Sequence, residues 1–185
     1  NNMLEVRSPY DQSLIKKIPL VGKQEVEKAL TTAYALFQDQ SKWIPAYERI
    51  AILERTATIM NTRMEELIKI AAQEGGKPYL DSKAEVIRAI DGVKIAAGHI
   101  SQLKGEQIPM SLTKASENRI AFTTREPIGV VFSISAFNHP LNLIVHQTVT
   151  ALAAGCPVII KPALTTPLSC LAFVEILKEA ALPHG

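Results

Sequence analysis

The last third of the sequence alternates between short apolar runs and longer helical patterns, and this alternation limits the possible folds. Residues 128–134 (I-G-V-V-F-S-I) and 157–160 (P-V-I-I) are short, apolar and rich in β-branched residues, as buried parallel strands are. Helical spacing follows each run, at 141–154 and 168–181. This β-α-β-α order predicts parallel strands joined by a right-handed crossover. We therefore expect an α/β fold that contains part of a doubly wound parallel sheet.

The first hundred residues have a different pattern. A turn cluster at 8–13 separates two short strand-like runs, at 4–6 and 15–18. Apolar residues at helical spacing then predict three amphipathic helices, at 24–38, 46–73 and 80–103. The second of these is expected to stop at Gly75-Gly76. The alternating stretch 117–125 predicts an exposed or edge strand.

The two carboxy-terminal helices carry their own signals. Residues 141–154 are apolar on nearly all sides, which predicts a buried helix with His146 as a core residue. Before the last helix, Thr166 is the expected N-cap and Pro167 the first helical residue.

In a doubly wound sheet, ligands bind beyond the carboxyl ends of the strands, and two segments occupy that place. Residues 135–140 (S-A-F-N-H-P) follow the first strand, and residues 161–167 (K-P-A-L-T-T-P) follow the second. Neither contains a G-x-G-x-x-G or Walker motif, so both are candidate nucleotide sites on position alone. Asn138 either donates its amide to a developing oxyanion or caps the following helix. Lys161 either extends to water or meets an anionic or hydroxylated ligand.

Composition argues against several classes of function. Lys and Arg number 20 against 18 Asp and Glu, and a net charge of +2 argues against a nucleic-acid partner. Cys156 and Cys170 lie in apolar stretches without metal-ligand spacing, so we expect buried, reduced thiols, no metal site and a cytoplasmic location. No signal-peptide pattern opens the chain, and no apolar run approaches the roughly 20 residues that span a bilayer, so no membrane partner is expected.

The segments around the two strands resemble the NAD(P)-dependent aldehyde dehydrogenase superfamily. Residues 126–141 read E-P-I-G-V-V-F-S-I-S-A-F-N-H-P-L, and residues 151–169 read A-L-A-A-G-C-P-V-I-I-K-P-A-L-T-T-P-L-S. In that family the first strand ends in a Pro-Trp-Asn or Pro-Phe-Asn turn, and the second in Lys-Pro-Ser/Ala-Glu. Upstream, E-R at 48–49 and E-G-G-K-P-Y-L at 74–80 are also similar to the family's amino-terminal helices. The resemblance covers nearly the whole chain.

The resemblance implies roles for individual residues. Asn138 would be the side-chain member of the oxyanion hole that holds a thiohemiacetal oxygen. Lys161 would contact the adenosine ribose of NAD, or the 2′-phosphate of NADP. The other implied positions line the cofactor cleft or the substrate tunnel. The cleft residues are Ile134, Ser135, Ala136, Phe137, Pro162, Ala163 and Leu164, and the tunnel residues are Leu143 and His146.

The resemblance also implies an organisation. Residues 1–104 would form amino-terminal strands and a helical layer. Residues 105–126 would form an oligomerisation strand region of a homodimer or homotetramer. Residues 127–185 would be the first, incomplete βαβα part of a Rossmann-type NAD(P)-binding domain.

Three positions depart from the family pattern. Leu164 stands where many members have a glutamate that binds the ribose hydroxyls, and without that carboxylate the repulsion against a 2′-phosphate is absent. Gln147 stands in place of a usual lysine, and Ala136 in place of a common proline. The family's nucleophilic cysteine, general-base glutamate and glycine-rich turn are expected beyond Gly185, so this fragment alone is expected to be inactive.

Two classes of function follow. The first is the amino-terminal portion of an oxidoreductase that oxidises an aldehyde to a carboxylic acid, with hydride transfer to NAD or NADP. The alternative is a non-catalytic nucleotide-binding or oligomerisation module. A third possibility is a related reductase of acyl phosphates with the same fold.

Overall fold

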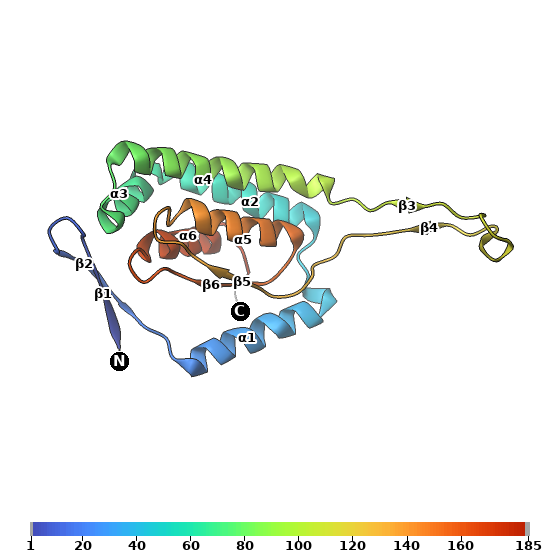
Figure 1. Ribbon diagram of the computed structural model, residues 1–185, viewed down its shortest axis with the longest axis horizontal. Coiled ribbons are helices and arrows are strands. Elements are labelled where there is room, and N and C mark those ends of the chain that lie inside the picture. Colours follow the sequence, from blue (N-terminus) through green and yellow to red (C-terminus); the bar gives the residue numbers. More distant parts are fainter. Residues whose placement is uncertain (1, 184–185) are drawn as a thin grey trace.

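A computed structural model of the chain describes residues 2–183 (Figure 1). Its amino-terminal hairpin pairs β1 (Met3–Arg7) with β2 (Leu14–Pro19) in antiparallel register, which confirms the predicted strand–turn–strand. Helix α1 (Lys23–Gln38) follows within one residue of its predicted limits.

The predicted helix at 46–73 is two helices in the structure. Helix α2 (Ala46–Thr62) ends at Arg63, which has φ −97° and ψ 19°, and α3 (Met64–Gly75) begins immediately after it. The apolar spacing continues through this corner, so periodicity did not reveal the break. Gly76 ends α3 with a φ of 60°, as the predicted stop requires.

The third predicted helix is shorter than expected. Helix α4 (Tyr79–His99) ends four residues before Leu103, and a 3₁₀ turn at Ile100–Gln102 completes the stretch.

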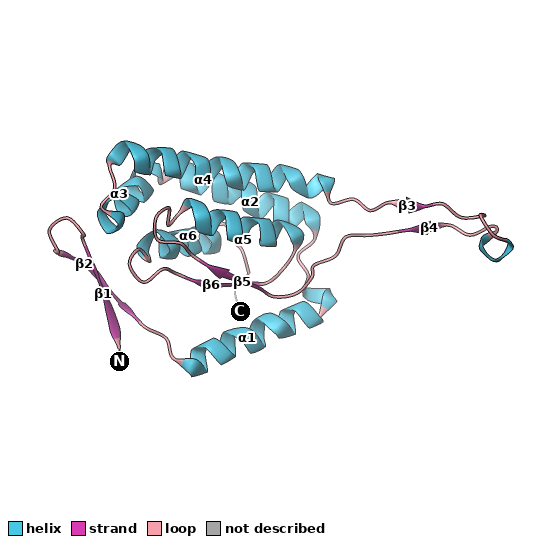
Figure 2. Ribbon diagram, in the orientation of Figure 1, coloured by secondary structure: helices cyan, strands magenta, loops and turns pink. Residues whose placement is uncertain are grey.

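An extended arm leaves the body of the protein after α4 (Figure 2). Within it, β3 (Gln107–Ile108) pairs antiparallel with β4 (Ala121–Phe122), so the strand predicted over 117–125 is real but only two residues long. A Cβ at Gly105 would lie 1.6 Å from the carbonyl oxygen of Thr123, so the base of the arm closes only with glycine there. The arm and its root expose large apolar side chains, namely Ile108, Leu112, Ile120, Phe122 and Ile128.

The carboxy-terminal region has the predicted βαβα order. It comprises β5 (Val131–Ile134), α5 (Asn142–Ala154), β6 (Val158–Lys161) and α6 (Leu168–Glu179). Strands β5 and β6 are parallel and in register from Val131 opposite Val158 to Ile134 opposite Lys161. Helices α5 and α6 lie between this sheet and the layer formed by α2, α3 and α4, while α1 lies on the other side of the sheet (Figure 1).

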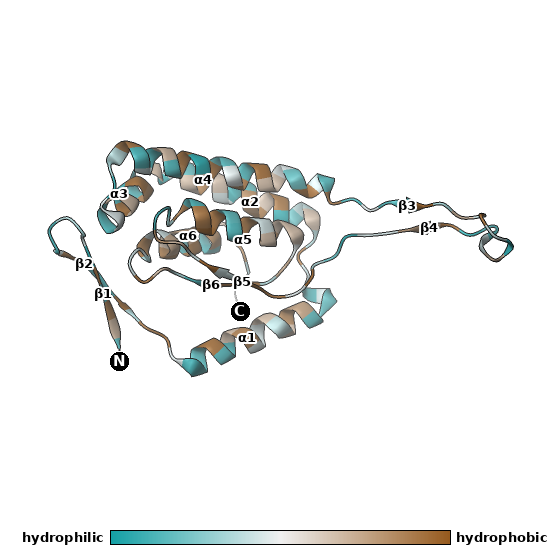
Figure 3. Ribbon diagram, in the orientation of Figure 1, coloured by the Kyte–Doolittle hydropathy of each residue, from teal (hydrophilic) through white to brown (hydrophobic). Residues whose placement is uncertain are grey.

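The core lies where the helical layers meet, and helices α2 to α6 each contribute buried apolar residues to it. The apolar stretches along these helices are brown in Figure 3. Helix α5 packs against α4 and also contacts both strands. The helical layer therefore fixes where the sheet lies through α5. The fully buried side chains include Leu53, Met60, Leu67, Ile68, Val93, Leu141, Ile144, Phe173 and Ile176.

A buried carboxylate, rather than Thr166, caps α6. Glu74 is 1% exposed, and its two oxygens accept hydrogen bonds from the backbone amides of Leu168 (2.6 Å) and Ser169 (2.8 Å). The predicted N-cap was therefore wrong, because the Thr166 hydroxyl donates to the carbonyl of Phe137 (3.1 Å) and Pro167 occupies the capping position. Burial raises the pKa of Glu74, and the bonds from Ser169 and Leu168 offset part of that effect.

We predict that Glu74→Gln lowers the free energy of unfolding by about 1–3 kcal/mol, because the new NH₂ group faces a buried backbone N–H and leaves it without an acceptor. Urea denaturation measures the change. The matched control is Glu175→Gln on the surface of α6, the helix that Glu74 caps, where loss of the exposed pair with Lys178 is expected to cost less than about 1 kcal/mol. Equal effects of the two substitutions would contradict the capping role.

Candidate functional site

Two loops leave the sheet from one edge. Ile134 and Lys161 are the last paired residues of β5 and β6, so the segments that follow them start side by side. The loops are also tied together by two hydrogen bonds. The amide of Ser135 donates to the carbonyl of Lys161 (3.0 Å), and the hydroxyl of Thr166 donates to the carbonyl of Phe137 (3.1 Å). The expected juxtaposition of the two candidate segments is present.

Asn138 lies exposed in the loop between β5 and α5. Within residues 2–183 its side-chain amide makes no hydrogen bond, whereas its backbone carbonyl accepts one from the Nζ of Lys77 (3.1 Å). The alternative that Asn138 caps the following helix is wrong. The amides of Leu141 and Asn142, at the start of α5, instead donate to Oε1 of Glu85 at 2.9 and 3.2 Å. The Asn138 side chain is thus available to a ligand.

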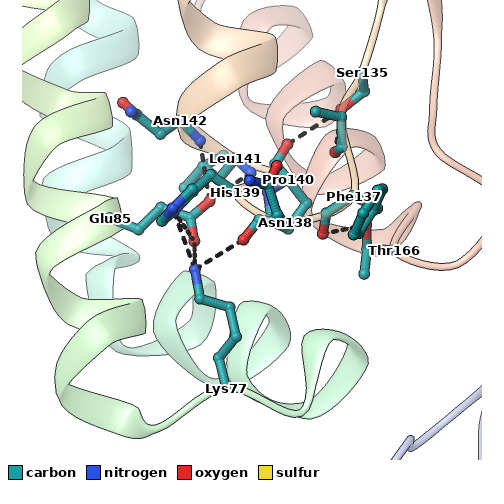
Figure 4. A network of polar contacts seen from close by, with 11 residues as sticks. Lys77, Glu85, Ser135, Phe137, Asn138, His139, Pro140, Leu141, Asn142 and Thr166 are labelled. Atoms are coloured by element: carbon teal, nitrogen blue, oxygen red, sulfur yellow. Dashed lines mark hydrogen bonds and ion pairs between the residues drawn. The ribbon is translucent and has the colours of Figure 1, made fainter.

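A polar network lies directly behind this loop (Figure 4). The Lys77 Nζ lies 2.6 Å from Oε2 of Glu85 and 3.1 Å from Nδ1 of His139. The side chain of Glu85 is fully buried and that of Lys77 is 17% exposed. Nδ1 of His139 also lies 3.7 Å from Oε2 of Glu85. Together, Lys77 and Glu85 connect the α3–α4 corner to the loop that carries Asn138.

The predicted cofactor residues lie on both loops. Ile134, Phe137 and Leu164 are exposed apolar side chains, and Ala136, Pro162 and Ala163 are half-buried beside them. The Lys161 side chain is exposed, and its Nζ donates to the carbonyl of Pro162 (3.1 Å). An ammonium group beside exposed apolar side chains fits a ligand with flat ring faces and anionic or hydroxyl groups.

Ser135 differs from the other predicted cofactor residues. It is 6% exposed, and its hydroxyl is directed at the carbonyls of Ala136 (3.3 Å) and Pro140 (3.4 Å) inside the loop. These two hydrogen bonds stabilise the shape of the loop.

The predicted tunnel residues lie on α5, three residues apart. Leu143 is half-buried, but His146 is exposed, so its expected place in the core was wrong. Helix α5 buries only part of its circumference, since Gln147 and Thr150 are also exposed. The imidazole lies beside α4, because a Cβ at Gly92 would be 3.5 Å from its Cδ2.

Both cysteines are buried thiols, as predicted. Burial, with a smaller contribution from Glu74, raises the pKa of Cys170 to about 12, which is the opposite of what a nucleophile needs. Residues 2–183 contain no group of three or more potential metal ligands. None of the helices in that range is long and apolar enough to cross a membrane.

Comparison with known proteins assigns the family. The sequence model of the aldehyde dehydrogenase family matches residues 1–185. The chain belongs to this family. Among curated relatives, the 3-sulfolactaldehyde dehydrogenases of Priestia aryabhattai and Priestia megaterium are 38% identical over 182 residues. The alignment covers 98% of this chain and 38% of theirs. A lactaldehyde dehydrogenase of Methanocaldococcus jannaschii is 36% identical, with 96% of this chain and 37% of that protein covered.

Solved aldehyde dehydrogenase structures have the same fold. Aldehyde dehydrogenase 21 of Physcomitrella patens, in complex with the reaction product succinate, superposes with a TM-score of 0.91 at 34% identity, covering 97% of this chain and 37% of that one. The glyceraldehyde-3-phosphate dehydrogenase of Methanocaldococcus jannaschii, complexed with NADP, gives 0.87 at 36% identity, covering 96% and 37%. The chain therefore spans less than two fifths of the length of these relatives.

Sequence reasoning missed Lys77, Glu74 and Glu85. The segment 74–80 is similar to the family's amino-terminal helices, but that resemblance implies no role for its charged residues. A signal did exist, because Glu85 is adjacent to Val86 and lies on the buried stripe of α4. A carboxylate on an apolar stripe indicates a buried partner.

Proposed function

We propose that this chain is the amino-terminal region of an aldehyde dehydrogenase that oxidises an aldehyde to a carboxylic acid and reduces NAD or NADP. The observation that carries the proposal is the family match over the whole chain, together with an exposed Asn138 amide at the edge where both loops begin. Relatives named for 3-sulfolactaldehyde and lactaldehyde favour a small polar aldehyde as substrate.

Asn138 would act on the oxygen of the aldehyde. When a nucleophile adds to the carbonyl carbon, that oxygen gains negative charge. A neutral, fixed amide N–H stabilises this charge more in the transition state than in the ground state. We propose that the nucleophile comes from the rest of the protein, because Cys156 and Cys170 are both buried in this region.

The two loops would hold the cofactor. Lys161 would supply a positive charge and hydrogen-bond donors to a ribose or its phosphate, while Ile134 and Phe137 would offer apolar surface to the rest of the molecule. When bound, NAD(P) supplies the hydride acceptor of the oxidation. Leu143 and His146, on the following helix, are proposed to border the substrate path.

Leu164 would permit NADP. It occupies an exposed position on the loop after β6, and it brings no negative charge near the Lys161 ammonium. Two neighbouring structures, from Methanocaldococcus jannaschii and Bacillus halodurans, are of glyceraldehyde-3-phosphate dehydrogenases complexed with NADP, which supports this proposal.

The arm over 105–126 is proposed to contribute to a homodimer or homotetramer. Its exposed apolar side chains, such as Ile120 and Phe122, are not covered by any other part of the described chain. The outer edges of the two-stranded β3–β4 ribbon are suited to pair with another copy. Residues 1–104 and 127–185 would then be the helical layer and the start of the NAD(P)-binding domain. An isolated nucleotide-binding or oligomerisation module is the alternative, and absence of dehydrogenase activity in the full-length protein would favour it.

In the full-length protein we predict that Asn138→Ala lowers kcat by about 10²–10³, the usual loss when one oxyanion donor is removed. Spectrophotometric assay of NAD(P)H formation measures the effect. Asn61→Ala, at an exposed position on α2, is the control and should leave kcat unchanged. A wild-type rate for Asn138→Ala would rule out the oxyanion role.

We further predict that Leu164→Glu lowers kcat/KM for NADP relative to NAD, by about 10-fold or more, because a carboxylate repels the 2′-phosphate. The ratio is obtained from initial rates with each cofactor. Leu80→Glu introduces the same charge on the exposed side of α4 and should leave the ratio unchanged. An unmoved ratio for Leu164→Glu would show that residue 164 does not select the cofactor.

A further inference from the structure

We propose that Lys77 and Glu85 are positioning residues that hold the backbone of the Asn138 loop, and so aim the Asn138 amide at the oxygen of the aldehyde. The proposal rests on the catalytic role of Asn138 proposed above. Both residues are far from the loop in sequence: Lys77 is 61 positions from Asn138, and Glu85 is 56 positions from Leu141.

The ammonium group of Lys77 has three partners and three protons. It lies 2.6 Å from Oε2 of Glu85, 3.1 Å from the carbonyl oxygen of Asn138 and 3.1 Å from Nδ1 of His139. With the imidazole proton on Nε2, each partner accepts one hydrogen bond. Figure 4 shows the side chain of Lys77 reaching from the α3–α4 corner to the underside of the loop. The ammonium therefore fixes the peptide that follows Asn138.

Glu85 holds the other side of the same loop. Its Oε1 accepts from the amides of Leu141 (2.9 Å) and Asn142 (3.2 Å), while its Oε2 pairs with Lys77. A buried carboxylate is tolerated only with this kind of compensation, and negative charge at a helix N-terminus is favourable. The short segment between Asn138 and Leu141 is thus attached to the helical layer at both ends.

A comparison with Glu74 separates positioning from stability. Glu74 also accepts hydrogen bonds from two backbone amides at a helix N-terminus, but both amides belong to α6. These bonds do not involve the backbone of a proposed catalytic residue. Lys77 contacts the backbone of Asn138 itself. Because a shift of about 1 Å in a reacting geometry costs about 100-fold in rate, loss of this anchor should lower turnover even where the protein stays folded.

The test is a double-mutant cycle in the full-length enzyme. Lys77→Met is expected to lower kcat by about 10- to 100-fold, with KM for aldehyde and for cofactor changed by less than about threefold. In an Asn138→Ala background, the same Lys77→Met change is expected to lower kcat by less than about threefold, because the group it positions is gone. Lys77→Arg keeps the charge and the donors and is expected to restore part of the activity.

Controls keep the result interpretable. Lys17→Met removes a lysine that lies 2.7 Å from Glu5 on the exposed hairpin, and should leave kcat unchanged. Thermal melting is measured for every variant to show that it folds. If Lys77→Met does not fold, the cycle is run with Lys77→Gln, which keeps a hydrogen-bond donor, and the kcat losses with and without Asn138 are compared in the same way. Fully additive losses in the cycle, or an unchanged kcat for the Lys77 variant, would overturn the positioning role. An unchanged kcat for Asn138→Ala alone would instead overturn the proposed role of Asn138, and the positioning role with it.

Discussion

Buried carboxylates at helix N-termini connect the helical layer to the sheet. Glu85 on α4 holds the first amides of α5, and Glu74 on α3 holds those of α6. Each helix begins directly after a loop at the carboxyl edge of the sheet. A buried amide or a buried carboxylate without a partner costs several kcal/mol. The hydrogen bonds between these carboxylates and the helix amides avoid that cost, and the same bonds hold the ends of both loops in place. The position of the candidate site therefore depends on helices that lie far from it in sequence.

The sequence predicted the order of elements well because order depends on local patterns. The β-branched runs near 131–134 and 158–161 and the turn at Gly76 each have a local cause, namely β propensity or a left-handed φ. The expected burial of the two strands was wrong, because Phe132 and Ile134 of β5 are exposed and β6 is at most half-buried. The corner at Arg63 did not emerge, because the apolar stripe continues through it. The strand over 117–125 was overestimated, since alternation does not show how many residues find a partner.

The candidate site was predicted in part. Position at the end of a strand marked Asn138 and Lys161, and the structure brings their loops together. The sequence does not show hydrogen bonds between residues that are far apart in the chain. The residue type and position of Thr166 predict a cap, but the acceptor is Glu74, which tertiary packing brings to the start of α6. His146 was assigned to the core because its neighbours are apolar, although the exposed side of α5 is narrow and includes it.

Hydrogen exchange of individual backbone amides, followed by NMR, tests the role of the buried carboxylates most directly. In Glu85→Ala, the amides of Leu141 and Asn142 should exchange about 10-fold faster or more than in the unsubstituted protein, because their shared acceptor is gone. The amides of Leu168 and Ser169, which Glu74 holds, should keep their protection. Unchanged protection at residues 141 and 142 would show that Glu85 does not hold the loop, and would contradict the account.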